Sequence, residues 1–257
     1  MPKKTIVMIH GFRGTHHGLA LISKELQDFK VVVPDIPGFG EGDSLDTYSL
    51  DSYVAWLHSF IQKQNAQPIL LGHSFGSIIT AAYAAKYGNT IEKLILVNPI
   101  GASALQGPRK ILTQLAVFYY WLGKKLPESL ARAWLSTKPI VYIMSVTMAK
   151  TRERPLRKYI HKQHFTYFSR FHTSASVLEA FQTSIQHSVA DVADDITTPT
   201  LLIAGAKDDI TPIAVQRQLI KQFKNARLVE IESVGHLTHY ETPVAVARAV
   251  QAFSNER

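Results

Sequence analysis

Short apolar runs alternate with amphipathic segments along residues 5–97. The runs are rich in Val, Ile and Leu, which is typical of strands buried on both faces of a parallel sheet. Between them, apolar side chains recur at the spacing of an amphipathic helix. The pattern predicts strands at residues 5–9, 31–33, 69–71 and 94–97, with helices at residues 17–29, 50–64 and 77–86.

The alternation stops after the fourth predicted strand. The next segment predicts only helices, at residues 111–125, 128–135, 140–148, 155–168 and 174–187. Strands then return at residues 200–204 and 227–231, with helices at residues 213–223 and 243–253. The chain therefore predicts an α/β fold with a doubly wound, mostly parallel sheet of about six strands. Residues 1–100 and 191–257 form this core, and residues 101–190 form a helical insertion after the fourth strand.

Functional loops of such a sheet lie at the carboxyl ends of its strands. Polar residues and glycines gather in the loops that follow four of the predicted strands, at residues 10–14, 72–76, 205–212 and 235–240. The helical insertion leaves the sheet at the same edge. It is therefore placed to cover a site there as a lid.

One of these loops, Gly72-His73-Ser74-Phe75-Gly76, joins a predicted strand to a predicted helix. The pattern G-x-S-x-G in this setting indicates a nucleophile elbow, in which a tight turn exposes the serine hydroxyl. A serine hydroxyl needs an adjacent base, and the base needs an orienting acid. His236 follows the sixth strand, and the loop after the fifth strand supplies Asp208 and Asp209 as candidate acids.

Taken together, these loops resemble those of the α/β-hydrolase superfamily with a helical cap domain, and the resemblance covers nearly the whole chain. The matching motifs are His10-Gly11-Phe12-Arg13-Gly14, Asp35-x-Pro37-Gly38-x-Gly40, the serine elbow, Gly205-x-x-Asp208-x-x-x-Pro212 and Gly235-His236. Many members begin with two antiparallel strands that this chain lacks. We therefore expect six strands and an unprotected first edge of the sheet.

The resemblance implies a role for each matching residue. It makes Ser74 the nucleophile, His236 the base and Asp208 the acid, since Asp208 stands three residues after the glycine of its loop; Asp209 is the alternative. The fourth strand ends in Asn98, so the acid position that some members use there is unoccupied.

By the same resemblance, the backbone N–H groups of Phe12 and Phe75 form the oxyanion hole. His73, beside the nucleophile, and Arg13, beside the oxyanion residue, are candidates for the substrate pocket. For Arg13, a solvated loop arginine is the simpler interpretation. We expect His10 to brace its loop rather than to take part in chemistry.

These roles predict a serine hydrolase that cleaves a carboxylic ester, with a largely apolar acyl or alcohol part, through an acyl-enzyme. One alternative is a carbon–carbon bond hydrolase of the diketone type, for which Arg13 or a cap arginine could hold the substrate carboxylate. A lysophospholipase or monoacylglycerol lipase would fit the basic cap. The alternative from another class is a ligand-binding protein that retains the triad.

Composition narrows the remaining options. The chain has no cysteine, which excludes disulfides and thiolate nucleophiles. His236 and His239 stand at metal-ligand spacing, but no carboxylate is spaced to join them, so we expect neither metal nor cofactor. The apolar run at residues 5–9 is too short for a signal peptide and no run approaches the ~18 residues of a membrane span, so we expect a cytoplasmic protein.

The net charge of +8 is concentrated in the helical insertion. Residues 101–190 contain 13 Lys and Arg but only 3 Asp and Glu. The simple interpretation is a lid whose basic face meets water, and the alternative is a lid that docks on an anionic membrane. No nucleic-acid-binding motif accompanies the charge, so we expect no nucleic-acid partner.

Overall fold

The computed structural model describes residues 3–64, 67–103 and 110–256. Within these ranges, one sheet of six strands has the order β2-β1-β3-β4-β5-β6, and every neighbouring pair is parallel. The strands are β1 (Thr5–Ile9), β2 (Lys30–Val32), β3 (Ile69–His73), β4 (Lys93–Val97), β5 (Thr200–Gly205) and β6 (Ala226–Ile231). The predicted parallel α/β fold is confirmed, and the short, half-buried strand β2 lies at one edge.

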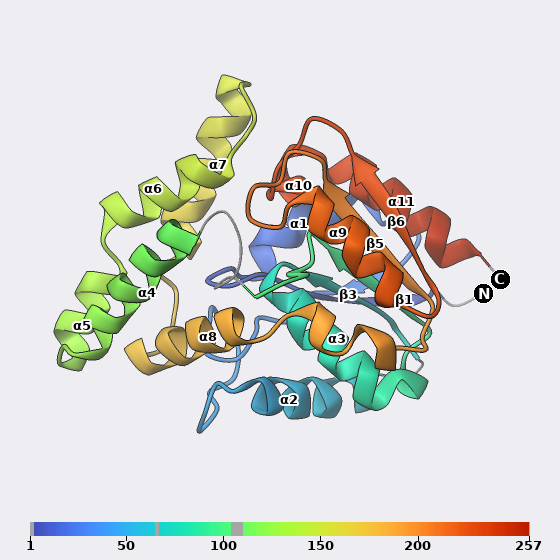
Figure 1. Ribbon diagram of the computed structural model, residues 1–257, viewed down its shortest axis with the longest axis horizontal. Coiled ribbons are helices and arrows are strands. Elements are labelled where there is room, and N and C mark those ends of the chain that lie inside the picture. Colours follow the sequence, from blue (N-terminus) through green and yellow to red (C-terminus); the bar gives the residue numbers. More distant parts are fainter. Residues whose placement is uncertain (1–2, 65–66, 104–109, 257) are drawn as a thin grey trace.

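Helices cover both faces of the sheet, as Figure 1 shows. Successive side chains of a strand point to opposite faces. In β1, Ile6 and Met8 therefore pack with α1 (Ala20–Glu25) and α11 (Pro243–Asn255). Val7 and Ile9 pack on the other face with α2 (Leu50–Gln62) and α3 (Phe75–Tyr87). The continuous apolar runs of the sequence are thus buried on both sides.

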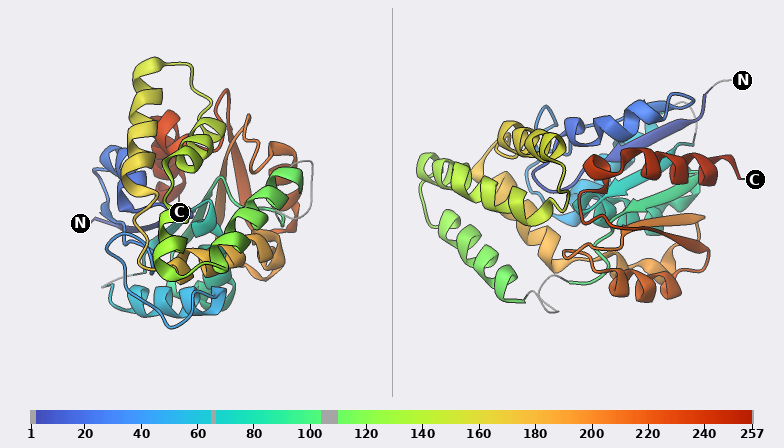
Figure 2. Two further views of the ribbon diagram at one scale, coloured as in Figure 1. Left: turned by 90° about the vertical axis from the view of Figure 1, so that its left-hand side faces the viewer. Right: turned by 90° about the horizontal axis from the view of Figure 1, so that it is seen from above.

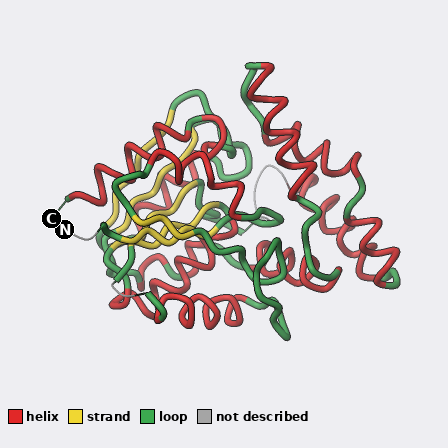
Figure 3. The backbone as a smooth tube through the Cα atoms, turned by 180° about the vertical axis from the view of Figure 1, so that it is seen from behind, coloured by secondary structure: helices red, strands yellow, loops and turns green. Residues whose placement is uncertain are grey.

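A group of helices follows β4 and lies to one side of the sheet in Figures 1 and 3 and in the right-hand view of Figure 2; in its left-hand view the group faces the viewer. We call this group the cap: α4 (Lys110–Lys124), α5 (Glu128–Leu135), α6 (Lys138–Met148), α7 (Arg154–Tyr167) and α8 (Ser174–Gln186). Each corresponds to one of the five predicted helices within a few residues. Residues 104–109 of the predicted insertion lie outside the described residues, and the limits 101 and 190 stay a prediction.

The cap is tied to the core through its last helix. On α8, the Thr183 hydroxyl donates to the Tyr48 carbonyl over 2.9 Å, and the Glu179 carboxylate accepts from the Tyr48 N–H over 2.8 Å. Just before α8, Phe171 forms an isolated antiparallel bridge with Phe39, in the loop that follows β2. The helices of the cap therefore rest on a loop at the carboxyl edge of the sheet.

Two predicted helices differ in form from the prediction, and one short helix was missed. The helix expected over residues 17–29 is a 3₁₀ turn, η1 (His16–Leu19), and the short α1, because Leu26 leaves the helical region with φ −105° and ψ 44°. The helix expected over residues 213–223 is α9 (Ile213–Leu219), which tightens into the 3₁₀ turn η5 (Ile220–Gln222). A short helix that was not expected, α10 (Thr238–Glu241), follows His236.

The other short 3₁₀ turns are η2 (Gly88–Thr90), η3 (Val189–Asp191) and η4 (Ala193–Asp195). In the ranges that the structure covers, no helix has both the length and the apolar character needed to cross a membrane.

Candidate active site

Ser74 occupies a strained turn between β3 and α3. Its backbone has φ 52° and ψ −118°, a conformation that costs a non-glycine residue ~1–3 kcal/mol and is typical of functional sites. The turn leaves no room for neighbouring side chains. A Cβ atom on Gly72 would lie 2.5 Å from the Gly76 carbonyl oxygen, and one on Gly76 would lie 2.3 Å from the Ile9 carbonyl oxygen. The two glycines of the motif are therefore required by the close approach of backbone.

Ser74, His236 and Asp208 form one hydrogen-bonded row. The Ser74 Oγ lies 2.8 Å from His236 Nε2, and His236 Nδ1 lies 2.8 Å from Asp208 Oδ2. The side chains of the histidine and the aspartate are 6% and 0% exposed. Asp209, the alternative acid, instead pairs with Lys150, which follows α6 of the cap. The structure thus brings together the serine, base and acid that the sequence singled out.

Asp208 is surrounded by donors. Its Oδ1 accepts from the N–H groups of Ile210 (2.7 Å) and Thr211 (3.0 Å), and its Oδ2 accepts from the Asn98 amide (2.8 Å) and the Thr211 hydroxyl. Burial by itself would raise the pKa of Asp208. The charge of His236 and the hydrogen bonds from His236 and Thr211 outweigh this and hold the pKa well below its usual value. Asp208 therefore stays ionised and fixes the Nδ1–H tautomer of His236.

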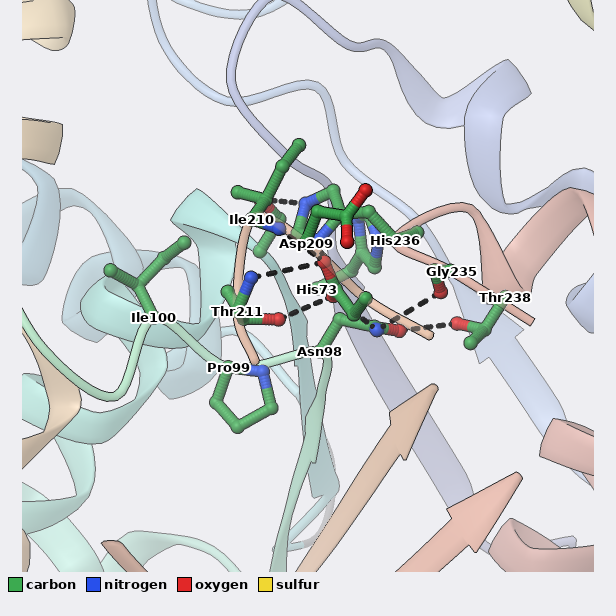
Figure 4. A network of polar contacts seen from close by, with 12 residues as sticks. His73, Asn98, Pro99, Ile100, Asp209, Ile210, Thr211, Gly235, His236 and Thr238 are labelled. Carbon is green, nitrogen blue, oxygen red and sulfur yellow. Dashed lines mark hydrogen bonds and ion pairs between the residues drawn. The ribbon is translucent and has the colours of Figure 1, made fainter. Parts of the chain in front are cut away.

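Asn98 contributes to the site in a way that the sequence reasoning missed. Asn98 directly follows β4, and its backbone lies in the left-handed region, with φ 47°. Its amide donates to Asp208 and, over 3.4 Å, to the Gly235 carbonyl, while its Oδ1 accepts from the Thr238 hydroxyl over 2.5 Å (Figure 4). Asn98 thus joins the acid loop to the base loop. The available signal was a polar residue at the carboxyl end of a central strand, at the edge where the loops converge.

The loop after β1 passes beside the nucleophile. A Cβ atom on Gly11 would lie 3.3 Å from the Ser74 Cβ. Phe75 is the first residue of α3, so its N–H has no acceptor within the helix. This N–H lies at the positive end of the helix dipole. The Phe12 and Phe75 rings pack edge to face, with centroids 6.2 Å apart. The two residues therefore flank Ser74, and their role as oxyanion donors stays a prediction.

His10 braces this loop, as predicted. Its buried Nε2 accepts from the Ile36 N–H over 2.9 Å, which assigns the ring proton to Nδ1. Nδ1 then donates to the Gly11 carbonyl over 2.9 Å. Both ring nitrogens are used, and burial lowers the pKa of His10, so this histidine acts in the structure as a neutral link between two loops.

A cavity of about 220 Å³ opens beside Ser74. It lies between the sheet edge and the cap, and its wall is mostly apolar. No Lys, Arg, Asp or Glu of the described chain lines it. The lining residues are His10, Gly11, Phe12, Gly14, Thr15, Gly18, Leu19, His73, Ser74, Met144, Met148, His164, Phe168, Ile210, His236, Leu237, His239 and Tyr240.

The predicted pocket residue His73 is among them. Burial and, to a smaller extent, the neighbouring His236 lower its pKa to about 3, so the ring is neutral. Its Nε2 lies 3.4 Å from the His236 carbonyl oxygen, and its ring centroid lies 4.2 Å from that of His239. The structure therefore places His73 in the wall of the cavity, packed against other imidazoles.

Arg13 corrects a prediction. It is neither a solvated loop arginine nor one of the residues that line the cavity, because its side chain is fully buried under the cap. The guanidinium donates to the carbonyls of Leu135 (2.6 Å) and Phe168 (2.9 Å) and to the Tyr120 hydroxyl (3.3 Å). The sequence did not reveal this role because the three acceptors lie more than a hundred residues away. Arg13 fastens the loop after β1 to the cap.

In the described ranges, no three His, Asp or Glu side chains lie close enough together to hold a metal ion. The polar groups of the site form a hydrogen-bonded row in which His236 can take the proton of Ser74 while Asp208 stays ionised.

The α/β hydrolase fold family model matches residues 4–243, and the chain belongs to this family. Among curated proteins, it is similar to Lipase 1 of Psychrobacter immobilis, with 26% identity over 260 residues that cover 96% of this chain and 76% of the lipase. It is also similar to monoacylglycerol lipase ABHD6 of Homo sapiens, with 26% identity and coverages of 98% and 75%.

Solved structures agree on the fold. The enol-lactonase of Burkholderia xenovorans LB400 superposes with a TM-score of 0.81, at 18% identity, over 100% of this chain and 93% of that chain. The family and these relatives identify the protein as a hydrolase.

Proposed function

We propose that the protein is a serine hydrolase that cleaves a carboxylic ester with a largely apolar acyl or alcohol part. The observation that carries the proposal is the row from Ser74 through His236 to Asp208, which opens on a mostly apolar cavity. Curated relatives named as lipases support the same reaction class.

In the proposed reaction, Ser74 Oγ attacks the ester carbonyl carbon while His236 Nε2 takes its proton. Asp208 holds the Nδ1–H of His236 and stabilises the imidazolium that forms. The oxyanion accepts hydrogen bonds from the N–H groups of Phe12 and Phe75, each worth ~10²–10³ in turnover. His236 then protonates the leaving alcohol. A water molecule, deprotonated by His236, hydrolyses the acyl-enzyme and restores Ser74.

The chemistry of the cavity favours an ester over a diketone with a carboxylate. A buried carboxylate needs a paired cation. Arg13, the cation that the sequence offered, is committed to the cap, and the described cavity wall contains no Lys or Arg. The volume also limits the substrate. A cavity of about 150 Å³ binds benzene, so 220 Å³ favours a short or medium acyl chain.

The decisive test compares p-nitrophenyl esters from acetate to palmitate on the wild-type protein and on Ser74→Ala. We expect a maximum at short to medium chains and a loss of at least ~10³-fold in Ser74→Ala. Ser129→Ala, an exposed serine on α5, serves as the matched control and keeps wild-type rates. Background rates across the wild-type series would instead favour a ligand-binding protein.

We further propose that the cap docks this hydrolase on an anionic membrane surface. Along one side of α4, Leu115, Phe118 and Trp121 are exposed, the last two stacked with centroids 5.8 Å apart. The exposed Lys124 ends the same helix, and the exposed Lys125 follows it. Aromatic side chains beside lysines suit the interface of an anionic bilayer, where each lysine contributes ~1 kcal/mol. The charge of residues 101–190, 13 basic residues against 3 acidic ones, favours the same partner.

Co-sedimentation with vesicles of neutral and anionic lipids tests this docking. We expect binding to anionic vesicles at low salt that weakens at high salt, because salt screens exposed charges. Replacing both Phe118 and Trp121 by Ser should abolish binding, whereas Val244→Ser, an exposed apolar residue of α11, should not. Equal sedimentation with and without anionic lipid would refute the docking surface.

A further inference from the structure

Two imidazole nitrogens in the cavity wall have no hydrogen-bond partner within the described chain: His164 Nε2 and His239 Nδ1. His164 is 1% exposed and His239 is 6% exposed, and both residues line the cavity beside Ser74. Buried polar groups in native proteins are nearly always paired. Two such unpaired atoms in one mostly apolar cavity therefore point to a ligand that pairs with them.

The His164 ring is held in place from the cap side. Its Nδ1 lies 2.7 Å from the Ser145 hydroxyl on α6, and that hydroxyl lies 2.6 Å from Nδ1 of His161 on α7. The ring also stacks on Phe168, with centroids 4.1 Å apart. With Nδ1 engaged and the ring fixed, Nε2 is the polar atom that His164 has left to offer.

The His239 ring approaches from the core side. It lies on α10, three residues after His236, and contacts the ring of His73. The Tyr240 ring packs against both of these histidines, with its centroid 4.3 Å from that of His239 and 5.8 Å from that of His164. One unpaired atom thus comes from the cap and the other from the core, next to the base of the proposed reaction.

The chemistry of the pair selects a neutral ligand. Burial lowers the pKa of His164 to about 3 and that of His239 well below its usual value, so both rings are uncharged at neutral pH. A carboxylate or an ammonium group would enter this cavity without a counter-ion. A hydroxyl group, in contrast, donates one hydrogen bond and accepts others, so it can satisfy imidazoles of either tautomer.

We propose that His164 and His239 form a polar subsite that binds a neutral hydroxyl group of the ester substrate. The preferred substrates are then esters with a free hydroxyl on the part that enters the cavity, such as a partly esterified polyol. This specificity rests on the proposed function, since it assigns the substrate class of the same site. It also gives the cap a direct part in substrate selection, because His164 and its supporting Ser145 both belong to cap helices.

Two pairs of esters, each differing by a hydroxyl in place of a methyl group, test the subsite. The first pair is 2-hydroxyethyl butanoate and propyl butanoate, and the second is methyl 5-hydroxypentanoate and methyl hexanoate. We expect kcat/KM, measured by acid release, to be at least ~10-fold higher for the hydroxylated member of one pair, because the other member leaves the imidazoles unpaired. Equal values within both pairs would overturn the proposal.

Variants then assign the preference to residues. His164→Phe and His239→Phe should each reduce the ratio within the preferred pair to less than about threefold. The matched control is His58→Phe, because His58 on α2 also has an unpaired Nδ1 but does not line the cavity; it should keep the wild-type ratio. A ratio that survives both cavity variants would refute the assignment.

The outcomes separate this inference from the proposed function. Hydrolysis of both members at equal rates would overturn the subsite and leave the esterase intact. No hydrolysis of any of the four esters, together with an unreactive Ser74, would refute the esterase. The wild-type ratio decides the subsite by itself if a variant fails to fold.

Discussion

The sheet edge and the cap face the same cavity, but they differ in how well their side chains are satisfied. At the edge, Asp208 accepts hydrogen bonds from backbone, hydroxyl, amide and imidazole groups, and His236 uses both ring nitrogens. In the cap, His164 keeps an unpaired nitrogen. Seven of the nine large hydrophobic side chains that are exposed in the described ranges also belong to the cap: Leu115, Phe118, Trp121, Leu130, Tyr142, Ile143 and Phe165.

The difference separates two tasks. The hydrogen-bonded row of Ser74, His236 and Asp208 holds one geometry whether or not a ligand is bound, which is what preorganised proton transfer requires. A cap with an unpaired polar group and exposed apolar side chains is stabilised when a ligand or another surface covers them. We infer that the edge determines the reaction and that the cap determines what reacts and where.

The largest expected effect lies at the edge and decides between two neighbouring acids. Asp208→Asn should lower kcat by ~10⁴, because the amide cannot fix the Nδ1–H tautomer of His236. Asp209→Asn, which breaks the partly exposed ion pair with Lys150, should change kcat by less than about threefold. Steady-state kinetics on one p-nitrophenyl ester measures both. If Asp209→Asn gave the larger loss, the acid would be misassigned.

The next effect lies at the joint between the two regions. Arg13→Met leaves the Leu135 and Phe168 carbonyls buried without a donor, which should lower the free energy of unfolding by about 3 kcal/mol. The melting temperature should then fall by ~6–12 °C. Arg170→Met, an exposed arginine just after α7, should leave it nearly unchanged. Equal melting temperatures for the two variants would mean that Arg13 does not fasten the cap.

A smaller effect is expected at Asn98. Asn98→Gly keeps the left-handed backbone available and removes only the side chain, so Asp208 loses one buried donor. We expect kcat to fall by ~10–100-fold with little change in KM. Asn225→Gly, at an exposed position before β6, is the matched control for an asparagine replaced by glycine. A change in KM alone would indicate that Asn98 acts on substrate binding instead.

The last effect concerns stability against pH. In the unfolded chain an imidazole takes up a proton below about pH 6.5, whereas in the fold His73 and His164 do so only near pH 3. The unfolded state therefore binds more protons between these values, so stability falls as the pH decreases, by up to ~1.4 kcal/mol per pH unit for each histidine.

Urea unfolding between pH 7 and pH 4.5 follows these imidazoles together with those of His10 and His239, whose pKa values burial also lowers. The pKa of Asp208 is lowered in the fold, so this group changes the stability mainly below the usual pKa of an aspartate, about 4. His164→Gln should flatten the dependence by one group. Identical stability at pH 7 and pH 5 would show that the buried imidazoles do not remain neutral.

Most of the edge could be predicted from the sequence because its signals are local. The strands are continuous apolar runs, and Gly72 and Gly76 stand where backbone atoms approach too closely for a side chain. The order of Ser74, Asp208 and His236 along the chain, together with parallel strands, places all three at one edge. The family resemblance supplied the choice of Asp208.

The cap and its contacts could not be predicted in the same way. The sequence around Arg13 indicates a loop arginine. Only the folded structure shows its hydrogen bonds to Tyr120, Leu135 and Phe168. Helical spacing gave the cap helices, but it could not indicate that His164 faces the cavity or that Ser145 occupies its other nitrogen. Such roles depend on packing between segments far apart in the sequence, which no local pattern records.

One measurement tests the central claim most directly: reaction of the folded protein with a fluorophosphonate probe, followed by intact mass and peptide mapping. We predict a single adduct on Ser74 in the wild-type protein, none in Ser74→Ala and a much slower reaction in His236→Ala, since the probe reacts only with an activated serine. An unreactive folded protein, or an adduct on a serine elsewhere, would contradict the account.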